Sequence, residues 1–144
     1  MNTIAIKAVI DTNVLVAIIG KKSPFRWIFD CIIQGKIRIC ISNEILTEYR
    51  EILELKNGVL VAENVINFIL VSPYTEKADI YFNFLLINQD EDDNKYVDCA
   101  VSKTADCIIT NDSHFQVLKK IEFPNVEVLT ISEFEAKYKN QLLN

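Results

Sequence analysis

The sequence contains little of several residue types that would suggest particular functions. Its 144 residues include one histidine, three glycines and three prolines. A single histidine excludes a metal site built on two histidines, and the low glycine and proline content argues against long flexible linkers. No apolar run approaches the roughly 20 residues that span a bilayer, and the polar N-terminus does not resemble a signal peptide. These absences predict one soluble, cytoplasmic domain over residues 1–144, with no membrane contact.

Cysteine usage excludes another group of functions. The four cysteines all lie in apolar segments, and no two of them are spaced as C-x-x-C: Cys31, Cys40, Cys99 and Cys107. This distribution is typical of buried, reduced thiols rather than of disulfides or zinc ligands.

The charge balance is acidic. The net charge is −5 and half of the residues are hydrophobic, which is the composition of a folded domain. Nucleic-acid-binding proteins usually show a basic surface, so the charge argues against that function. The argument weakens if the acids cluster, because carboxylates that hold divalent cations can bind phosphate through the metal. The basic residues that could line a groove are Lys21, Lys22, Arg26, Lys95 and Lys103.

Short apolar runs alternate with helical patterns along the chain. Strands are predicted at Ala5–Asp11, Ile37–Ser42, Cys107–Thr110 and Val126–Thr130. Helices are predicted at Asn13–Ile19, Pro24–Ile33, Asn43–Leu55, Glu63–Val71, Asp93–Thr104, Ser113–Lys120 and Ser132–Leu143. The alternation predicts an α/β fold, a three-layer sandwich whose central parallel sheet of four to five strands is flanked by helices.

Local signals predict where several helices begin. Ser23 would cap a helix with Pro24 in its first position, and Ser42 or Asn43 would cap the helix after the second strand. Ser132 and Glu135 have the spacing of a capping box for the last helix. The pattern after Pro73 is ambiguous: Glu76–Phe84 reads as a helix, and Phe84–Ile87 reads alternatively as a strand.

Acidic residues follow two of the predicted strands. Ligand sites of open parallel sheets form at the carboxyl ends of the strands. Asp11 ends the first strand and Asp112 lies just past CIIT. Glu44 and Glu48 occupy the first turns of the helix after the second strand and could reach the same edge, although a solvated face is an equally good interpretation of Glu48.

The run QDEDDNKYVDCAV, residues 89–101, contains five acids that are not equally good candidates for a functional site. Asp93 continues the apolar stripe of its predicted helix, which is an unusual place for a carboxylate without a function. Residues 90–92 precede the helix and are better explained as favourable charges at its N-terminus. Asp98 flanks the stripe, and its role stays open.

Four acids from separate elements could therefore converge: Asp11, Glu48, Asp93 and Asp112. Such a cluster is self-repelling unless cations neutralise it. Oxygen ligands select hard ions, which points to Mg²⁺ or Mn²⁺. Ions of this kind with open coordination positions suit phosphodiester hydrolysis.

Four segments of the chain also resemble a known family. VIDTNVLVAI, SNEILTEYREIL, DDNKYVDCAV and ADCIITNDSHF occur in the order found in PIN domains, across residues 9–115. The form with DDNK before the helix and IITND after it resembles a subfamily described as toxins of toxin–antitoxin pairs, the VapC-like ribonucleases.

The resemblance implies a function and roles for individual residues. The fold would be PIN-like, and the activity would be hydrolysis of RNA with Mg²⁺ or Mn²⁺. Asp11, Glu48, Asp93 and Asp112 would be the metal-binding, catalytic acids, with Asn13 and Thr110 as polar supports. It also implies a small antitoxin partner and allows a homodimer. Where many family members have a further acid beyond the fourth, this chain has His114, which could contact phosphate or a metal, although a structural or surface role is the stronger expectation.

Two alternatives remain open from the sequence. A non-catalytic PIN-like module would bind RNA or protein without cleaving it. A haloacid-dehalogenase-like phosphatase also has an acid after its first strand, but it requires a second acid at the position of Asn13.

Overall fold

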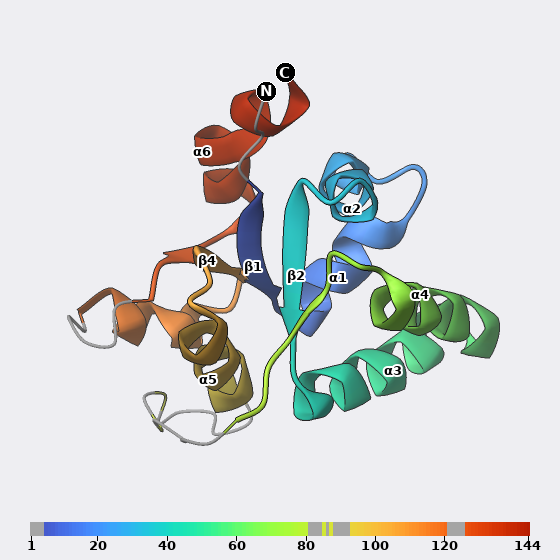
Figure 1. Ribbon diagram of the computed structural model, residues 1–144, viewed down its shortest axis with the longest axis horizontal. Helices are drawn as coiled ribbons and strands as arrows, with labels where there is room; N and C mark the ends of the chain where they lie inside the picture. Colours follow the sequence, from blue (N-terminus) through green and yellow to red (C-terminus); the bar gives the residue numbers. More distant parts are fainter. Residues whose placement is uncertain (1–4, 81–84, 86, 88–92, 121–125) are drawn as a thin grey trace.

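The computed structural model describes residues 5–80, 85, 87, 93–120 and 126–144. The elements follow one another along the chain as shown in Figure 1: β1 (Ile6–Ile10), α1 (Thr12–Ile19), α2 (Arg26–Ile33), β2 (Ile37–Ile41), α3 (Asn43–Asn57), α4 (Val59–Val71), β3 (Glu76–Lys77), α5 (Asn94–Lys103), β4 (Cys107–Ile109), the 3₁₀ helix η2 (Ser113–Lys120), β5 (Val128–Leu129) and α6 (Ile131–Leu143).

All five strands are parallel and form one sheet in the order β3-β2-β1-β4-β5. The central strand is β1, in which Ala8 pairs with Ile39 of β2 on one side and with Cys107 of β4 on the other. Helices flank the sheet, so the predicted α/β sandwich with a parallel sheet is confirmed. Its central strands are buried almost throughout, as expected for a sheet covered on both faces.

The helices form two groups according to what they contact. The α5 helix packs against β1, β2 and β4, whereas α1 contacts α2 and α3. The α3 and α4 helices lie side by side as an antiparallel pair on the right of Figure 1. Gly58 joins them with a φ of 89°, a conformation that glycine adopts without a steric penalty.

The strand order creates a topological switch point. The chain moves from β1 outward through β2 and β3, and then crosses to the other side of β1 to form β4 and β5. The connections that leave β1 and β4 therefore diverge at the carboxyl end of the sheet, which is the lower edge in Figure 1. Crevices of this kind hold the ligands of open α/β proteins.

Two predicted helix caps are wrong, each by two residues. The α2 helix begins at Arg26, because the Ser23 hydroxyl accepts a hydrogen bond from the Phe25 amide and donates one to the Ala17 carbonyl in a preceding turn. The α6 helix is capped by Thr130 rather than by Ser132. Thr130 and Glu133 form the reciprocal capping box that was expected two residues later.

Two other helix starts differ in how well the sequence predicts them. Ser42 caps α3 and accepts a hydrogen bond from the Ile45 amide, as one of the two predictions stated. The α4 helix begins at Val59, four residues before the predicted start, because it follows Gly58 directly.

The predicted helix Glu76–Phe84 is wrong at its first residues. Glu76 and Lys77 form the edge strand β3 and pair with Cys40 and Ile41 of β2. Pairing with an existing sheet edge outweighs the intrinsic helix preference of Glu and Lys. The alternative strand over 84–87 falls largely outside the described residues, as do acids 90–92.

The four cysteines are free and buried, as predicted. Burial raises the pKa of Cys40, Cys99 and Cys107 to about 12, so these thiols are poor nucleophiles at neutral pH. Within the described segments, every helix is too short or too polar to cross a membrane.

Candidate active site

Asp11 lies at the end of the central strand, where β1 passes into α1. Its carboxylate is buried and accepts a 2.7 Å hydrogen bond from the hydroxyl of Thr110 at the end of β4. Its amide donates to the carbonyl of Ile109, so the β1–β4 pairing extends to this residue. The predicted support of Asp11 by Thr110 is thus present as a direct contact.

The surroundings of Asp11 disfavour its charge. Burial raises its pKa above the usual value, and the Thr110 hydrogen bond offsets this only in part. The negative charges of Glu48 and Asp112 raise the pKa further. A cation in this place would relieve both the burial cost and the repulsion.

Glu48 approaches the site from α3 and is held by three donors. One carboxylate oxygen accepts hydrogen bonds from the hydroxyls of Thr12 and Tyr96. The other forms an ion pair with Lys95 of α5, at 3.1 Å. Burial alone would raise the pKa of Glu48, but these hydrogen bonds and the lysine charge outweigh it and lower the pKa. Glu48 is therefore ionised and fixed in position at neutral pH.

The position of α3 explains why Glu48 and not Glu44 reaches the site. Tyr49 is fully buried, and its hydroxyl donates to the carbonyl of Ile10 in β1. This contact turns the face next to Tyr49 toward the end of β1. Glu44, one turn earlier, is exposed.

Asp112 follows β4 and is fixed by two backbone hydrogen bonds. Its amide donates to the Thr110 hydroxyl at 3.0 Å, and its carboxylate accepts a 2.9 Å bond from the amide of His114. Thr110 therefore links Asp11 and Asp112. The same turn directs the imidazole of His114 back over the site, with Nδ1 3.5 Å from Oδ1 of Asp112.

Asp93 completes the arrangement from the other side. It directly precedes α5, is buried, and its Oδ2 lies 3.7 Å from Nδ1 of His114. One ligand atom each of Asp93, Asp112 and His114 lies within 4.8 Å of the other two, a spacing that could hold a metal ion. The buried position of Asp93 is consistent with the prediction that it continues the apolar stripe of its helix.

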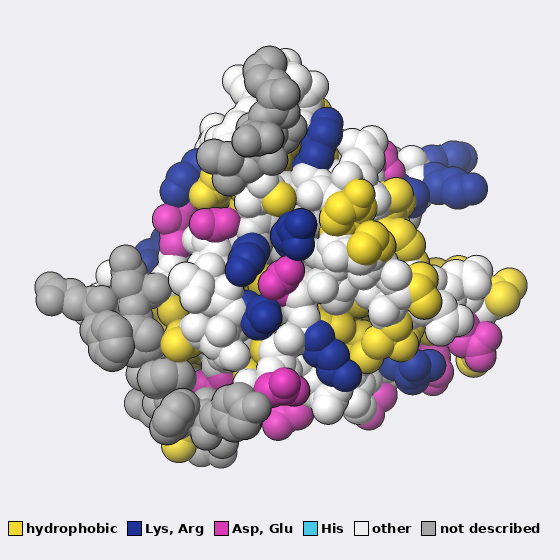
Figure 2. Space-filling view, in the orientation of Figure 1, with side chains coloured by type: hydrophobic (Ala, Val, Ile, Leu, Met, Phe, Trp, Pro, Cys, Tyr) yellow, Lys and Arg dark blue, Asp and Glu magenta, His cyan; other side chains and the backbone are white. Residues whose placement is uncertain are grey.

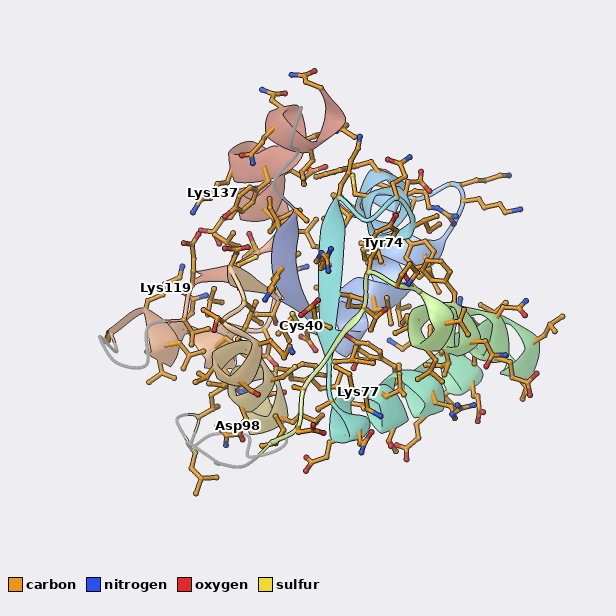
Figure 3. All side chains as sticks on the ribbon, in the orientation of Figure 1. Cys40, Tyr74, Lys77, Asp98, Lys119 and Lys137 are labelled. Carbon is orange, nitrogen blue, oxygen red and sulfur yellow. The ribbon has the colours of Figure 1, made fainter. Side chains whose placement is uncertain are left out.

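The remaining candidates lie elsewhere or contribute less. Asn13 is exposed on α1 and makes no side-chain hydrogen bond to the described part of the site. Asp98, labelled in Figure 3, is buried on α5 and lines a separate cavity of about 100 Å³ with Ser42 and Asn94. It is not a member of the Asp93–Asp112–His114 group.

The predicted basic groove is only partly present at the site. Lys95 faces Glu48, and the two open onto a groove that α3 lines with Glu44, Thr47 and Glu51. Arg26 instead pairs with Asp30, and Lys103 lies near Glu76.

Three residues contribute to the site in ways that the sequence pattern does not predict: Thr12, Tyr96 and His114. Thr12 and Tyr96 are buried next to predicted acids. Nothing in the sequence pattern distinguishes hydrogen bonding to Glu48 from ordinary packing for these two residues. For His114 a structural or surface role was the stronger expectation and metal contact the weaker one, yet its imidazole lies against two of the predicted acids. Its place two residues after Asp112 was the one available signal, because a turn of that length can point a side chain back toward the strand end.

Fold and site together define an open α/β protein with a carboxylate-rich site at the switch point of its parallel sheet. The model of the PIN domain family matches residues 7–114, and the chain belongs to this family. It matches no curated protein by sequence.

The fold is also similar to that of a solved structure. A chain of the crystal structure of VapBC2 from Rickettsia felis, bound to a DNA fragment from their promoter, has a TM-score of 0.59 to this chain. The two are 15% identical, and the match covers 87% of this chain and 98% of that chain. At this identity the likeness concerns the fold alone.

Proposed function

We propose that this protein is a divalent-metal-dependent endoribonuclease, which acts as the toxin of a toxin–antitoxin pair. The observation that carries the proposal is the convergence of Asp11, Glu48 and Asp112 at the switch point, with Asp93 and His114 facing Asp112. Family membership supports a nuclease, and the similarity to a VapBC2 chain supports the pairing with an antitoxin.

The residues present fit a divalent ion. Asp93 and Asp112 offer carboxylate oxygens, the donors that Mg²⁺ and Mn²⁺ prefer. The Nδ1 atom of His114 is buried beside them and makes no hydrogen bond within the described part of the chain. Asp11, linked to Asp112 through Thr110, has a raised pKa that a nearby cation would lower.

The chain's own residues would divide the work of hydrolysis. A bound divalent ion would polarise a phosphodiester and a water molecule. Asp93, Asp112 and Asp11 would hold the ion, directly or through water. Glu48, fixed by Thr12, Tyr96 and Lys95, would orient the attacking water and hold its proton. Because the hydrogen bonds from Thr12 and Tyr96 and the charge of Lys95 lower its pKa, Glu48 is ionised at neutral pH and available to accept that proton.

The substrate and partners belong to the same proposal. We infer RNA as the substrate, a small antitoxin as the partner, a cytoplasmic location and a homodimer as the working assembly. Residues 1–144 would act as one domain.

The test is cleavage of a labelled RNA by the purified protein with Mg²⁺, with Mn²⁺ and with EDTA. Cleavage should require one of the metals and should fall at least about 100-fold in Glu48→Gln. Glu44→Gln is the matched control, because it changes an exposed acid one turn away on the same helix. Metal-independent cleavage, or equal losses in both variants, would refute the assignment.

The non-catalytic module is the alternative outcome of the same experiment. It predicts RNA retention in a binding assay with no cleavage under any metal condition. The phosphatase alternative loses its support, because the chain belongs to the PIN family and an exposed Asn13 stands where a second acid is required.

A further inference from the structure

We infer that His114 is a direct metal ligand, and that its nitrogen makes the site select Mn²⁺ over Mg²⁺. The inference rests on the proposed metal-dependent function and adds to it a ligand and a preference that the four carboxylates alone do not supply. It follows from the position of one imidazole atom.

The geometry brings the imidazole into the ligand group. Nδ1 of His114 lies 3.5 Å from Oδ1 of Asp112 and 3.7 Å from Oδ2 of Asp93. Two ligand atoms of one octahedral ion, each about 2.1 Å from it, lie about 3.0 Å apart in adjacent positions and about 4.2 Å apart in opposite ones. Both observed separations fall between these limits.

Neither separation is that of a hydrogen bond. A protonated imidazole that donates to a carboxylate approaches it to about 2.8 Å, whereas Nδ1 is buried and makes no hydrogen bond within the described residues. Nδ1 thus lies between two carboxylates without a hydrogen bond to either, a position that suits a metal ligand.

The backbone keeps this arrangement in position without help from the imidazole. The His114 amide donates to Asp112 Oδ1, and the Asp112 amide donates to Thr110. The side chain of His114 is 41% exposed, so its outer edge faces solvent while Nδ1 faces the acids. A substitution here should therefore change the ligand set more than the fold.

A nitrogen ligand changes which ion the site prefers. Mg²⁺ binds almost only to oxygen and gives up its bound water reluctantly. Imidazole favours first-row transition ions, of which Mn²⁺ also accepts carboxylate ligands well. One nitrogen among carboxylate oxygens therefore raises the affinity for Mn²⁺ relative to Mg²⁺.

The chain offers an unusually clear test, because His114 is its only histidine. Pulsed electron paramagnetic resonance of the Mn²⁺-loaded protein, with no affinity-tag histidines, should show a directly coordinated imidazole nitrogen. His114→Ala should abolish that signal and raise the Mn²⁺ dissociation constant about tenfold or more. The Mg²⁺ constant, measured by competition, should change less than about threefold.

Two further variants make the result specific. His114→Asp replaces the nitrogen by oxygen and should retain binding while the preference for Mn²⁺ over Mg²⁺ falls. Gln116→Ala, at an exposed position of the same 3₁₀ helix, should change nothing. Thermal unfolding of each variant without metal checks that the fold is retained.

The outcomes separate this inference from the proposed function. Metal-dependent cleavage without a nitrogen signal, or a signal that persists in His114→Ala, would overturn the inference and leave the nuclease standing. A loss of cleavage in His114→Ala at unchanged Mn²⁺ affinity would overturn it too, and would assign His114 to the substrate. Absence of both Mn²⁺ binding and metal-dependent cleavage would defeat the two together.

Discussion

Two clusters of charged side chains are built in opposite ways. Next to the edge strand β3, Glu76 is surrounded by cations: Arg38 at 3.1 Å, Lys103 at 3.6 Å and Lys7 at 3.7 Å. Figure 2 shows a group of dark blue side chains around a magenta one, in front of β1 and β2. At the carboxyl edge the acids predominate. There the ion pair of Lys95 with Glu48 lies among four acids: Asp11, Glu48, Asp93 and Asp112.

The difference separates a structural cluster from a site. Around Glu76 the chain supplies all the opposite charge that the carboxylate needs, and Arg38 also stacks over the ring of Tyr74, labelled in Figure 3. At the carboxyl edge the fold holds acids together and leaves one of them, Asp11, with a raised pKa. In the proposed function, a cation from outside would offset the repulsion that Asp11 meets at this edge.

The largest effect should come from breaking the carboxyl edge. Asp11→Asn removes the acid at the end of the central strand and should reduce RNA cleavage by about 100-fold or more, since the ion loses a charged partner. The unfolding free energy of the metal-free protein at pH 7 should stay equal or rise, because a disfavoured buried charge is gone. Chemical denaturation and single-turnover cleavage measure the two. A variant that is less stable than the wild type and still cleaves RNA would contradict the assignment of Asp11 to a cation site.

Adding the missing cation should be the next largest effect. At 100 times its dissociation constant, an ion that binds only the folded protein stabilises it by about 2.7 kcal/mol. Mn²⁺ should therefore raise the melting temperature of the wild type and of Lys103→Ala, which changes the Glu76 cluster. It should have a much smaller effect on Asp93→Asn. Equal shifts in all three proteins would mean that Mn²⁺ binds somewhere other than at the proposed site.

A smaller effect is expected from loosening Glu48. Tyr96→Phe removes one of its hydrogen-bond donors and leaves the buried ring in place, at a stability cost of about 1 kcal/mol. Cleavage should fall about tenfold in kcat with little change in KM, because Glu48 is less well oriented for the reaction. Tyr74→Phe, a hydroxyl removed from the other cluster, serves as the control. A pure KM effect would assign Tyr96 to substrate binding.

The smallest effect should come from the Glu76 cluster. Partial burial would raise the pKa of Glu76, but the hydrogen bond from Arg38 and the charges of Lys7, Lys103 and Arg38 lower it overall. The charge of Glu76 therefore stabilises the fold above pH 4.5, and this contribution is lost as the pH falls through the lowered pKa.

Glu76→Gln should accordingly cost at most about 1 kcal/mol at pH 7, as for other partly exposed ion pairs. The difference from the wild type should shrink in acid, where Glu76 is protonated, and RNA cleavage should be unchanged. Denaturation curves at several pH values measure this. A difference that grows toward low pH would show that the pKa of Glu76 is raised instead.

Much of this architecture is readable from the sequence because parallel strands are short apolar runs with acids at their ends. Asp11 and Asp112 are predictable in this way, since strand ends meet at one edge. Asp93 is predictable from helix periodicity, because a carboxylate in an apolar stripe requires an explanation.

The rest depends on contacts between distant segments. The short strand at Glu76–Lys77 exists because β2 offers an unpaired edge, which no local pattern reveals. The choice of Thr130 over Ser132 as helix cap follows from where β5 ends. The clamp on Glu48 joins α1, α3 and α5, and the position of the His114 imidazole depends on two hydrogen bonds in the turn after β4.

The strand order has a consequence for the chain while it is being synthesised. Asp11 and Glu48 belong to the half of the protein that leaves the ribosome first, whereas Asp112 and His114 follow the strand that is inserted on the other side of β1. Until β4 pairs with β1, Asp11 lacks Thr110 and the proposed ion lacks two of its ligands. If the proposed function holds, a nascent chain would be unable to cleave RNA until its last third has emerged and folded.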